Sequence, residues 1–406
     1  MSGRPFLQIP GPTNVPDRIL RAMDRPVIDH RGPAFAELTK AILPGLRQVF
    51  GTREGAVVLY PSSGTGAWEA SLVNVLAPGD RVLAFNYGHF SALFAQTARN
   101  LGYEVDEVPL RWGQELPAER VKARLRADRG DRPYAAVLVV HNETSTGVTS
   151  DIGAIRAAMD AAGHDALLIV DTVSSLASIE FRFDQWRVDV ALTGSQKGLM
   201  LPPGLGLVCA GPRALARGEA GGSPRSFFDW RPILRDNAAG FFPYTPATLL
   251  LYGLREALTM LVEEEGLDAV YARHRFLADG VRAALGAWGL ANLCERPEYY
   301  SNTLTAVVMP EGVDSDAVIR TARERFGLAL GVGLGRIKGK VLRIGHLGAL
   351  NELEVLATLG GVELALAESG VPVALGSGGA AAQRVFSRAP AGTIAGDRRG
   401  EAVLTS

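Results

Sequence analysis

Lys197 is the residue of this 406-residue chain that first points to covalent chemistry. It lies in the segment GSQKGLML, just after a predicted strand and among small and apolar neighbours. A lysine that is poorly solvated in such a loop has a lowered pKa, so its neutral amine can attack an aldehyde and form an imine. For one such residue taken alone, a solvated loop lysine is the commoner outcome.

The segment SSGTGAWEA, residues 62–70, follows a predicted strand and opens a predicted helix. Small residues at a helix N-terminus let backbone N–H groups approach an anion, and the hydroxyls of Ser63 and Thr65 add further donors. The segment matches neither the Walker A loop nor the G-x-G-x-x-G loop. It could bind a single phosphate, although a Ser- and Gly-rich turn with a capped helix is an equally good interpretation.

Asp171 ends the apolar run ALLIVD. A carboxylate at the carboxyl end of a buried parallel strand lies where α/β proteins bind ligands. Beside the pyridine nitrogen of pyridoxal phosphate (PLP) it would keep that nitrogen protonated, so that the ring withdraws electrons. Helix capping is the commoner role of a lone aspartate at such a junction. Together, a phosphate cradle, an acid at a strand end and a following lysine form the order expected of a PLP enzyme.

Arg343, in the segment RIGHLG, is a candidate for substrate binding. A guanidinium presents a planar fork that matches a carboxylate with two hydrogen bonds, and every α-amino acid carries that carboxylate. Without its segment, a surface arginine at a strand end would be the preferred interpretation.

The middle of the chain predicts the strands and helices that would position these residues. Its apolar runs lack polar alternation, which indicates a sheet covered on both faces, and amphipathic stretches at 66–79 and 150–163 separate several of them. Strands separated by helices indicate a mostly parallel sheet in an α/β fold. The predicted strands span 56–61, 81–86, 135–140, 166–171, 189–194 and 205–210.

The pattern changes after a long predicted helix at 249–266, and the remainder reads as a smaller α/β domain. Asn351 is expected to cap its last helix, with Glu354 in the capping-box position. We predict a large domain with an N-terminal arm over 1–265, a small C-terminal domain over 266–376, and a mobile or arm-like extension over 377–406. Other elements predicted in the small domain are helices at 271–288 and 314–327 and strands at 303–310, 328–333 and 340–344.

Composition narrows the class of protein. The formal net charge of −1 gives no global drive toward nucleic acid or anionic membranes. Cys209 and Cys294 have no Cys or His at metal-ligand spacing, so neither a disulfide framework nor a metal site is expected. The N-terminal segment has no signal-peptide pattern, and the apolar runs are too short to cross a bilayer. A cytoplasmic protein is the resulting expectation.

Several long segments resemble the class V aminotransferases, which are PLP enzymes of fold type I, and most closely their serine–glyoxylate and alanine–glyoxylate branches. The resemblance covers roughly residues 6–380 and implies a large domain with a mostly parallel seven-stranded sheet, a smaller C-terminal α/β domain, PLP, and a homodimer or tetramer with composite active sites. The matching segments are PGPTNVP, DHRGPAF, SSGTGAWEA, HNETSTGVTSDI, VDTVSSLAS, GSQKGLMLPPG, FPYTPAT and RIGHLG.

The resemblance also implies a role for each site residue. Lys197 would form the Schiff base, Asp171 would pair with the pyridine nitrogen, and Arg343 would bind the substrate carboxylate. Thr144 would reach the ring hydroxyl or the substrate. The remaining cofactor contacts would be Ser63, Gly64, Thr65 and Gln196 at the phosphate, Phe90 stacked on the ring, Val173 beneath it, and Tyr244 and Thr245 at the phosphate of the partner subunit's cofactor.

The implied reaction is ping-pong transamination from a small L-amino acid, L-serine by preference, to glyoxylate, giving hydroxypyruvate and glycine. Alanine and aspartate remain alternative donors, and a pyridoxamine–pyruvate aminotransferase is a more distant alternative. A PLP lyase and a cysteine desulfurase on the same fold are further alternatives. The desulfurase would need a reactive cysteine in a mobile loop of the smaller domain, for which Cys294 is the only candidate. A non-catalytic binding protein would not be expected to keep Lys197, Asp171 and Arg343 together.

Overall fold

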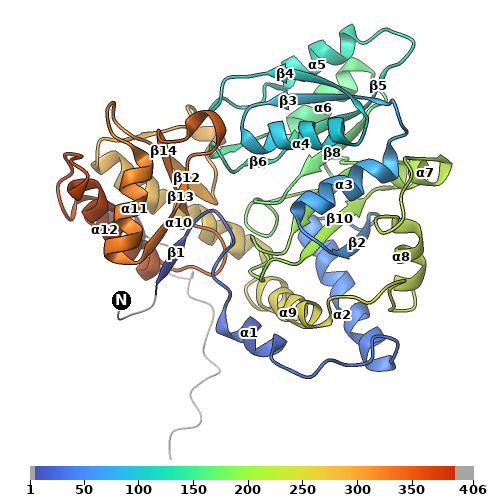
Figure 1. The fold of residues 1–406 in the computed structure, drawn as a ribbon, viewed down its shortest axis with the longest axis horizontal. Helices are drawn as coiled ribbons and strands as arrows, with labels where there is room; N and C mark the ends of the chain where they lie inside the picture. Colours follow the sequence, from blue (N-terminus) through green and yellow to red (C-terminus); the bar gives the residue numbers. More distant parts are fainter. Residues whose placement is uncertain (1–4, 389–406) are drawn as a thin grey trace, which may run out of the picture.

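The structure is a computed structural model that describes residues 5–388, and it contains two large sheets flanked by helices and one two-stranded sheet (Figure 1). The larger sheet has seven strands in the order β2-β10-β9-β8-β5-β3-β4. Strand β10 runs antiparallel to both its neighbours, whereas the other pairs are parallel, so the prediction of a mostly parallel seven-stranded sheet is confirmed. The strands are β2 (Ala56–Pro61), β3 (Arg81–Asn86), β4 (Glu104–Pro109), β5 (Tyr134–Val140), β8 (Leu167–Asp171), β9 (Val190–Gly194) and β10 (Leu205–Ala210).

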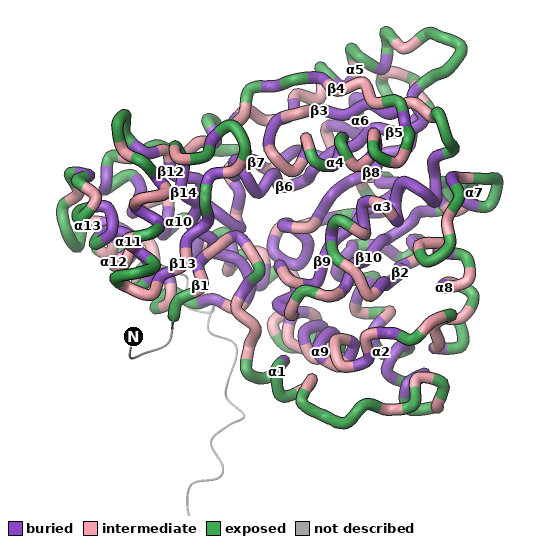
Figure 2. Tube along the Cα trace, in the orientation of Figure 1, coloured by how far each residue is buried: buried purple, intermediate pink, exposed green. Residues whose placement is uncertain are grey.

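The central strands are mostly apolar because both of their faces are buried. On β8, Leu168 and Val170 belong to one hydrophobic cluster, whereas Leu167 and Ile169 belong to another on the opposite face. Figure 2 shows the same strands as an uninterrupted buried layer. Strand β4, EVDEVP, was not predicted, because it forms the edge of the sheet and keeps polar side chains.

Helices cover both faces of this sheet (Figure 1). A short hairpin of β6 (Asn142–Glu143) and β7 (Val148–Thr149) follows β5. The helices are α1 (Asp17–Met23), α2 (Pro33–Phe50), α3 (Gly64–Val75), α4 (His89–Asn100), α5 (Ala118–Ala127), α6 (Ile152–Ala162), α7 (Pro212–Ala220), α8 (Trp230–Asn237) and α9 (Thr248–Leu258), the last continuing through a π-helical turn, Thr259–Glu264.

The small sheet has the order β1-β13-β14-β12-β11. The predicted cap of α12 is confirmed, since Asn351 Oδ1 accepts a hydrogen bond from Glu354 N (3.1 Å) and Glu354 Oε2 accepts one from Asn351 N (3.0 Å). The elements are β1 (Phe6–Gln8), α10 (Leu267–Ala287), β11 (Ala291–Asn292), β12 (Leu304–Val308), α11 (Ser315–Phe326), β13 (Leu328–Val332), β14 (Val341–Gly345), α12 (Glu352–Glu368) and α13 (Ser377–Phe386), with 3-10 turns at Pro297–Tyr299 and Gly335–Ile337.

Two features of the structure bear on the predicted domain division, which stays a prediction. The N-terminal arm does not lie with the large domain alone, because β1 pairs in parallel with β13 and completes the small sheet. The extension predicted from residue 377 begins with α13, which packs on α10. Gly280 allows this close approach, because a Cβ there would collide with Phe386. Residues 389–406 lie outside the described range.

We therefore propose that the small domain comprises β1 together with the chain from residue 266 to α13. Helix α10 supports a boundary near 266, because it packs on α12 and α13. None of the described helices combines the length and hydropathy that a bilayer span requires.

Candidate active site

The amine of Lys197 lies in a buried position just beyond the end of β9. The residue is 9% exposed, and its Nζ donates a hydrogen bond to the carbonyl of Pro10, in the segment that leads from β1 to α1. Thr13 Oγ1 donates to the Lys197 carbonyl (3.1 Å), which holds this segment against the lysine loop. Burial, followed by the charge of Arg343, lowers the pKa of Lys197 to about 7, against the opposing effect of Asp171. Such an amine is neutral often enough near pH 7 to act as a nucleophile.

The carboxylate of Asp171 is 3% exposed at the carboxyl end of β8. Its Oδ1 accepts a hydrogen bond from the backbone N–H of Val173 (2.7 Å), and its Oδ2 accepts one from the indole Nε1 of Trp68 (2.8 Å). Burial raises the pKa of Asp171 to about 7, although both hydrogen bonds lower it. The group therefore changes charge close to neutral pH, and small changes in its surroundings decide its state.

The start of α3 presents a cradle of small and hydroxyl residues. Ser63 is the N-cap, and its Oγ accepts a hydrogen bond from Gly66 N (3.3 Å). Ser63 and Thr65 are exposed, so their hydroxyls are accessible to a ligand. Gly64 lies against Val173, and a Cβ there would be 2.8 Å from Val173 Cγ2. A helix N-terminus built in this way can bind a phosphate.

Gln196 adds a polar group beside this cradle. Its Oε1 is buried and has no hydrogen-bond partner among residues 5–388. This oxygen and the backbone nitrogen of Gly64 lie 2.7 and 3.1 Å from the position that a Cβ on Gly194 would take. An unsatisfied buried amide needs an explanation, and a ligand at the cradle would provide one.

The small sheet contributes Arg343, which lies on β14 and is 7% exposed. Its Nε donates to the carbonyl of Val332 (2.9 Å), and its Nη1 donates across to the carbonyl of Thr144 in the large domain (2.8 Å). Burial lowers the pKa of Arg343 to about 10, so the guanidinium stays protonated near pH 7. These bonds use Nε and Nη1 and leave Nη2 to bind a carboxylate.

Thr144 is itself held in place. Its Oγ1 donates to Ser174 Oγ (2.6 Å), which in turn donates to the carbonyl of Asn142 (2.9 Å). The hairpin of β6 and β7 and the loop after β8 are thereby fixed relative to each other.

Sequence reasoning missed Glu143, a fully buried carboxylate in the same hairpin. Its Oε1 accepts hydrogen bonds from Ser145 Oγ (2.7 Å) and from the backbone N–H of Phe90 (3.3 Å), and its Oε2 accepts one from Ser91 N (2.8 Å). Glu143 therefore caps the helix that carries Phe90. Its place in HNETSTG, directly after a buried strand, was the available signal, but a loop glutamate gives the same pattern.

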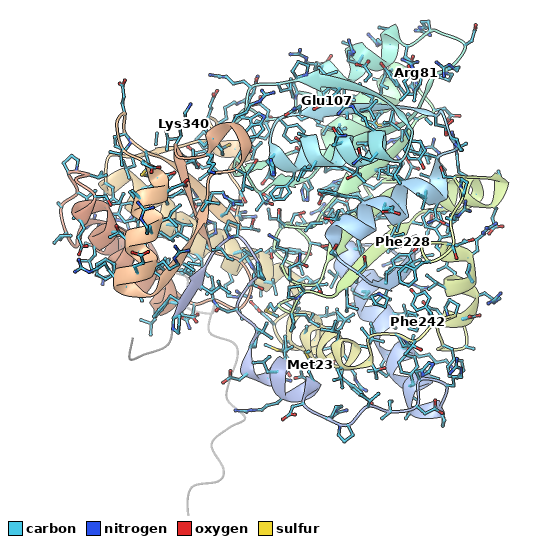
Figure 3. The ribbon with its side chains drawn as sticks, in the orientation of Figure 1. Met23, Arg81, Glu107, Phe228, Phe242 and Lys340 are labelled. Atoms are coloured by element: carbon cyan, nitrogen blue, oxygen red, sulfur yellow. The ribbon has the colours of Figure 1, made fainter. Side chains whose placement is uncertain are left out.

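Tyr244 and Thr245 form no hydrogen bond with Lys197 within the described residues 5–388. Tyr244 packs in an aromatic group at the edge of the large sheet, with its ring 4.8 Å from that of Phe227, and its hydroxyl donates to the carbonyl of Leu59 (3.2 Å). Phe228 and Phe242 pack on the same hydrophobic cluster as Tyr244, and Figure 3 shows both of them in the large domain. Thr245 is exposed and keeps its hydroxyl accessible.

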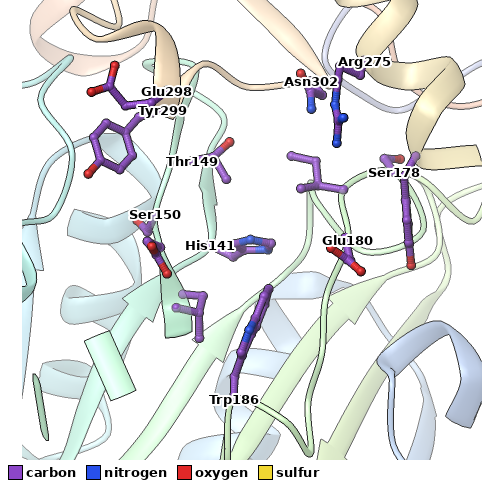
Figure 4. A pocket seen from close by; sticks show the side chains of 14 residues that line it. His141, Thr149, Ser150, Ser178, Glu180, Trp186, Arg275, Glu298, Tyr299 and Asn302 are labelled. Carbon is purple, nitrogen blue, oxygen red and sulfur yellow. The ribbon is translucent and has the colours of Figure 1, made fainter. Parts of the chain in front are cut away.

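A separate cavity of about 390 Å³ opens between the two domains (Figure 4). His141, Trp186 and Arg275 line it, but none of the residues predicted for the active site does. The amine of Lys197 is therefore absent from its walls, and the candidate site is the Lys197 cluster. Within that cluster the structure brings together the predicted residues Ser63, Gly64, Thr65, Thr144, Asp171, Val173, Gln196, Lys197 and Arg343, with Phe90 at the start of the neighbouring helix.

Known proteins are similar to this chain over almost its whole length. The chain matches the family described as aminotransferase class-V over residues 6–338. It is 50% identical to serine–glyoxylate aminotransferase of Methylorubrum extorquens, across 96% of this chain and 97% of that protein. It is 46% identical to L-aspartate–glyoxylate aminotransferase of Paracoccus denitrificans, across 94% and 96% of the two chains.

Among solved structures, ureidoglycine–glyoxylate aminotransferase of Bacillus subtilis is similar with a TM-score of 0.87 and 29% identity, across 95% of this chain and 99% of that one. Sequence and fold agree over nearly the full length, and the chain belongs to the class-V aminotransferase family.

Proposed function

We propose that this protein is a PLP-dependent aminotransferase that moves the amino group of L-serine to glyoxylate, giving hydroxypyruvate and glycine by a ping-pong reaction. The observation that carries the proposal is one buried site in which the charges of Asp171 and Arg343 both act on the buried amine of Lys197, with Arg343 held there by the carbonyl of Thr144. The choice of serine rests on the 50% identical serine–glyoxylate relative.

The site residues fit PLP in both charge and shape. The exposed hydroxyls of Ser63 and Thr65 and the unsatisfied Gln196 Oε1 surround the helix N-terminus that would hold the phosphate. Asp171 offers a carboxylate for the ring nitrogen, and Lys197 offers the amine that would carry the cofactor. Val173 and Phe90 would enclose the ring from either face.

When bound, PLP supplies an electron sink that stabilises the negative charge developing at the substrate Cα. Lys197 Nζ would then move the proton between the substrate Cα and C4′ of the cofactor, a role that suits an amine with a pKa near neutrality. Arg343, fixed by two carbonyls, would hold the carboxylate shared by the amino acid and the oxo acid.

The decisive experiment combines cofactor loading with a panel of donors. Wild-type protein should bind PLP with a visible absorption band, and L-serine should give the highest kcat/KM with glyoxylate as acceptor. Aspartate is the second candidate donor, because the chain is also 46% identical to an aspartate–glyoxylate aminotransferase. A higher kcat/KM for aspartate or alanine would correct the donor and leave the reaction class intact.

Replacing Lys197 tests the reaction class. We expect Lys197→Ala to fold and to lose transamination by roughly 10²-fold to 10⁴-fold or more, since the residue would both carry the cofactor and move the proton. A visible cofactor band or turnover equal to wild type in this variant would overturn the proposal.

The desulfurase alternative receives no support from the cysteine it would need. Cys294 is 1% exposed, and burial raises the pKa of its thiol to about 11. A reactive cysteine requires an accessible thiol with a lowered pKa.

We further propose a homodimer in which the exposed Thr245 reaches the cofactor phosphate of the partner subunit. Tyr244 is a second candidate for this contact. Tyr244 is the weaker candidate, because its hydroxyl already donates to the carbonyl of Leu59 within its own chain.

A further inference from the structure

We propose that Trp68 is a positioning residue whose indole N–H holds the carboxylate of Asp171 in the plane and charge state needed to keep the cofactor ring nitrogen protonated. The inference rests on the proposed function, since it requires PLP in the Lys197 site.

The carboxylate of Asp171 has two anchors from different directions. The backbone N–H of Val173 donates to Oδ1 (2.7 Å), and Trp68 Nε1 donates to Oδ2 (2.8 Å). The terminal torsion of an aspartate is broad, so one anchor alone leaves the carboxylate free to turn. Donors on both oxygens fix its plane, and the second donor comes from another element, α3.

Trp68 is in turn fixed by its own helix. It lies one turn after Gly64 on α3, so the two residues share a face, and Gly64 lies against Val173. The same face that contacts the Asp171 loop therefore starts at the proposed phosphate cradle. A tryptophan at this position couples the two ends of the cofactor site.

A neighbouring helix holds the other side of the indole. Trp68 is 4% exposed and stacks on Phe94 of α4, with ring centroids 5.3 Å apart and an interplanar angle of 17°. Phe90, the residue proposed to stack on the cofactor, lies one turn earlier on α4. The helices that carry the phosphate cradle and the stacking ring thus meet at Trp68.

The hydrogen bond also acts on charge. Burial raises the pKa of Asp171 to about 7, and the Val173 and Trp68 donors oppose that rise. Without the indole donor, the proton shared by Asp171 and the ring nitrogen would move toward the carboxylate, since the charged carboxylate would lose a stabilising partner. A neutral ring nitrogen withdraws fewer electrons, so proton removal from the substrate would slow.

Trp68→Phe separates this role from packing, because phenylalanine keeps an aromatic ring against Phe94 and removes only the N–H and part of the indole. The matched control is Trp288→Phe. Trp288 is also buried, and its Nε1 donates at the same 2.8 Å to a buried carboxylate, Glu363, but in the small domain. Both variants lose one indole–carboxylate hydrogen bond, and only one of them lies at the proposed cofactor site.

Each protein would be loaded with PLP carrying ¹⁵N at the ring nitrogen, and the ¹⁵N chemical shift would report whether that nitrogen is protonated. We expect Trp68→Phe to bind PLP with a shift toward the unprotonated nitrogen and to lower kcat roughly tenfold to hundredfold, with KM for L-serine little changed. Trp288→Phe should lower thermal stability and leave both the shift and kcat as in wild type.

A wild-type shift and wild-type kcat in Trp68→Phe would overturn the inference while leaving the proposed function standing. Failure of the wild-type chain to bind PLP would instead overturn the proposed function. If Trp68→Phe does not fold, the same measurements are made on Trp68→His, which keeps a ring N–H. Its ¹⁵N chemical shift and kcat should lie between the wild-type values and those expected for loss of the hydrogen bond. Failure of both variants to fold would show that Trp68 acts through packing, and would also overturn the inference.

Discussion

At the scale of single residues, burial shifts the pKa values of a base, Lys197, and an acid, Asp171, toward each other. It lowers the pKa of Lys197 to about 7 and raises the pKa of Asp171 to about 7. Each group also opposes part of the other's pKa shift, because the charged form of one stabilises the charged form of its neighbour. Residues that change protonation near neutral pH inside a shared site are typical of catalytic centres.

The titration of Lys197 predicts how the apoprotein captures PLP. Only the deprotonated amine is a nucleophile, so the capture rate should rise as pH passes about 7 and level off above about 8, instead of rising toward the ordinary lysine pKa of 10.5. The growth of the visible cofactor band in stopped-flow mixing measures the rate. Nα-acetyl-lysine, which keeps a free ε-amine, is the control in the same buffers. Parallel pH profiles for the protein and for Nα-acetyl-lysine would contradict the prediction.

Arg343 predicts a change in substrate binding more than in chemistry. Arg343→Ala should raise KM for both L-serine and glyoxylate roughly tenfold to hundredfold, because each substrate loses a charge-assisted hydrogen bond worth about 1.5–3 kcal/mol. Steady-state kinetics with each substrate varied in turn measure the effect. Arg325→Ala, at an exposed ion pair with Glu368, is the control. An effect on one substrate alone would mean that another residue binds the second carboxylate.

At the scale of elements, the N-terminus of α4 is completed by a side chain from elsewhere in the chain. Glu143 accepts hydrogen bonds from the backbone N–H groups of Phe90 and Ser91 and from Ser145. A negative charge at this end of a helix is favourable, and its burial makes each of these bonds stronger than on the surface. The orientation of Phe90 therefore depends on a hairpin more than fifty residues away.

Glu143→Gln tests this dependence. The amide keeps the shape but turns one acceptor into a donor facing Ser91 N–H, so we expect a loss of about 1.5–3 kcal/mol in the free energy of unfolding and weaker PLP binding. Urea unfolding and PLP titration measure the two effects. Glu119→Gln, at an exposed position in the first turn of α5, should change neither. Wild-type stability in the Glu143 variant would contradict the capping role.

At the scale of the whole molecule, the site exists only because several distant parts of the chain meet. Lys197 and Asp171 come from the large sheet, Arg343 comes from the small sheet, and the carbonyl that accepts from Lys197 belongs to Pro10. The bond from Arg343 to Thr144 joins the two domains directly across the site. The proposed contact of Thr245 with the partner subunit would add a residue from a second chain to this site.

Mixed dimers test that contact. Lys197→Ala and Thr245→Glu should each be inactive alone, the second because a carboxylate would repel the cofactor phosphate. Refolded together, they should regain activity, since each mixed dimer has one site with an intact Lys197 and an intact partner Thr245. Transaminase assays on the mixture, with sedimentation to confirm dimers, measure this recovery. No recovery would place both residues in the site of one subunit.

Most strands of the large sheet and the start of the last long helix of the small domain were predictable from the amino-acid sequence, because they depend on local signals. Six apolar runs identified their strands since both faces of each are buried, and Asn351 with Glu354 identified the start of α12 since a capping box lies within one turn. Lys197, Asp171 and Arg343 also stood out from local signals. Asp171 ends an apolar strand, Lys197 lies just after one, and Arg343 lies within one.

Tertiary structure alone decided which groups act on these residues. Trp68 and Asp171 are 103 positions apart, and no local pattern distinguishes a tryptophan that donates to a carboxylate from one that only packs. The same holds for Glu143 at α4, for β1 in the small sheet and for α13 against α10. Lys197 and Asp171 titrate near pH 7 because the folded chain removes water around them, and that removal depends on every element that packs there.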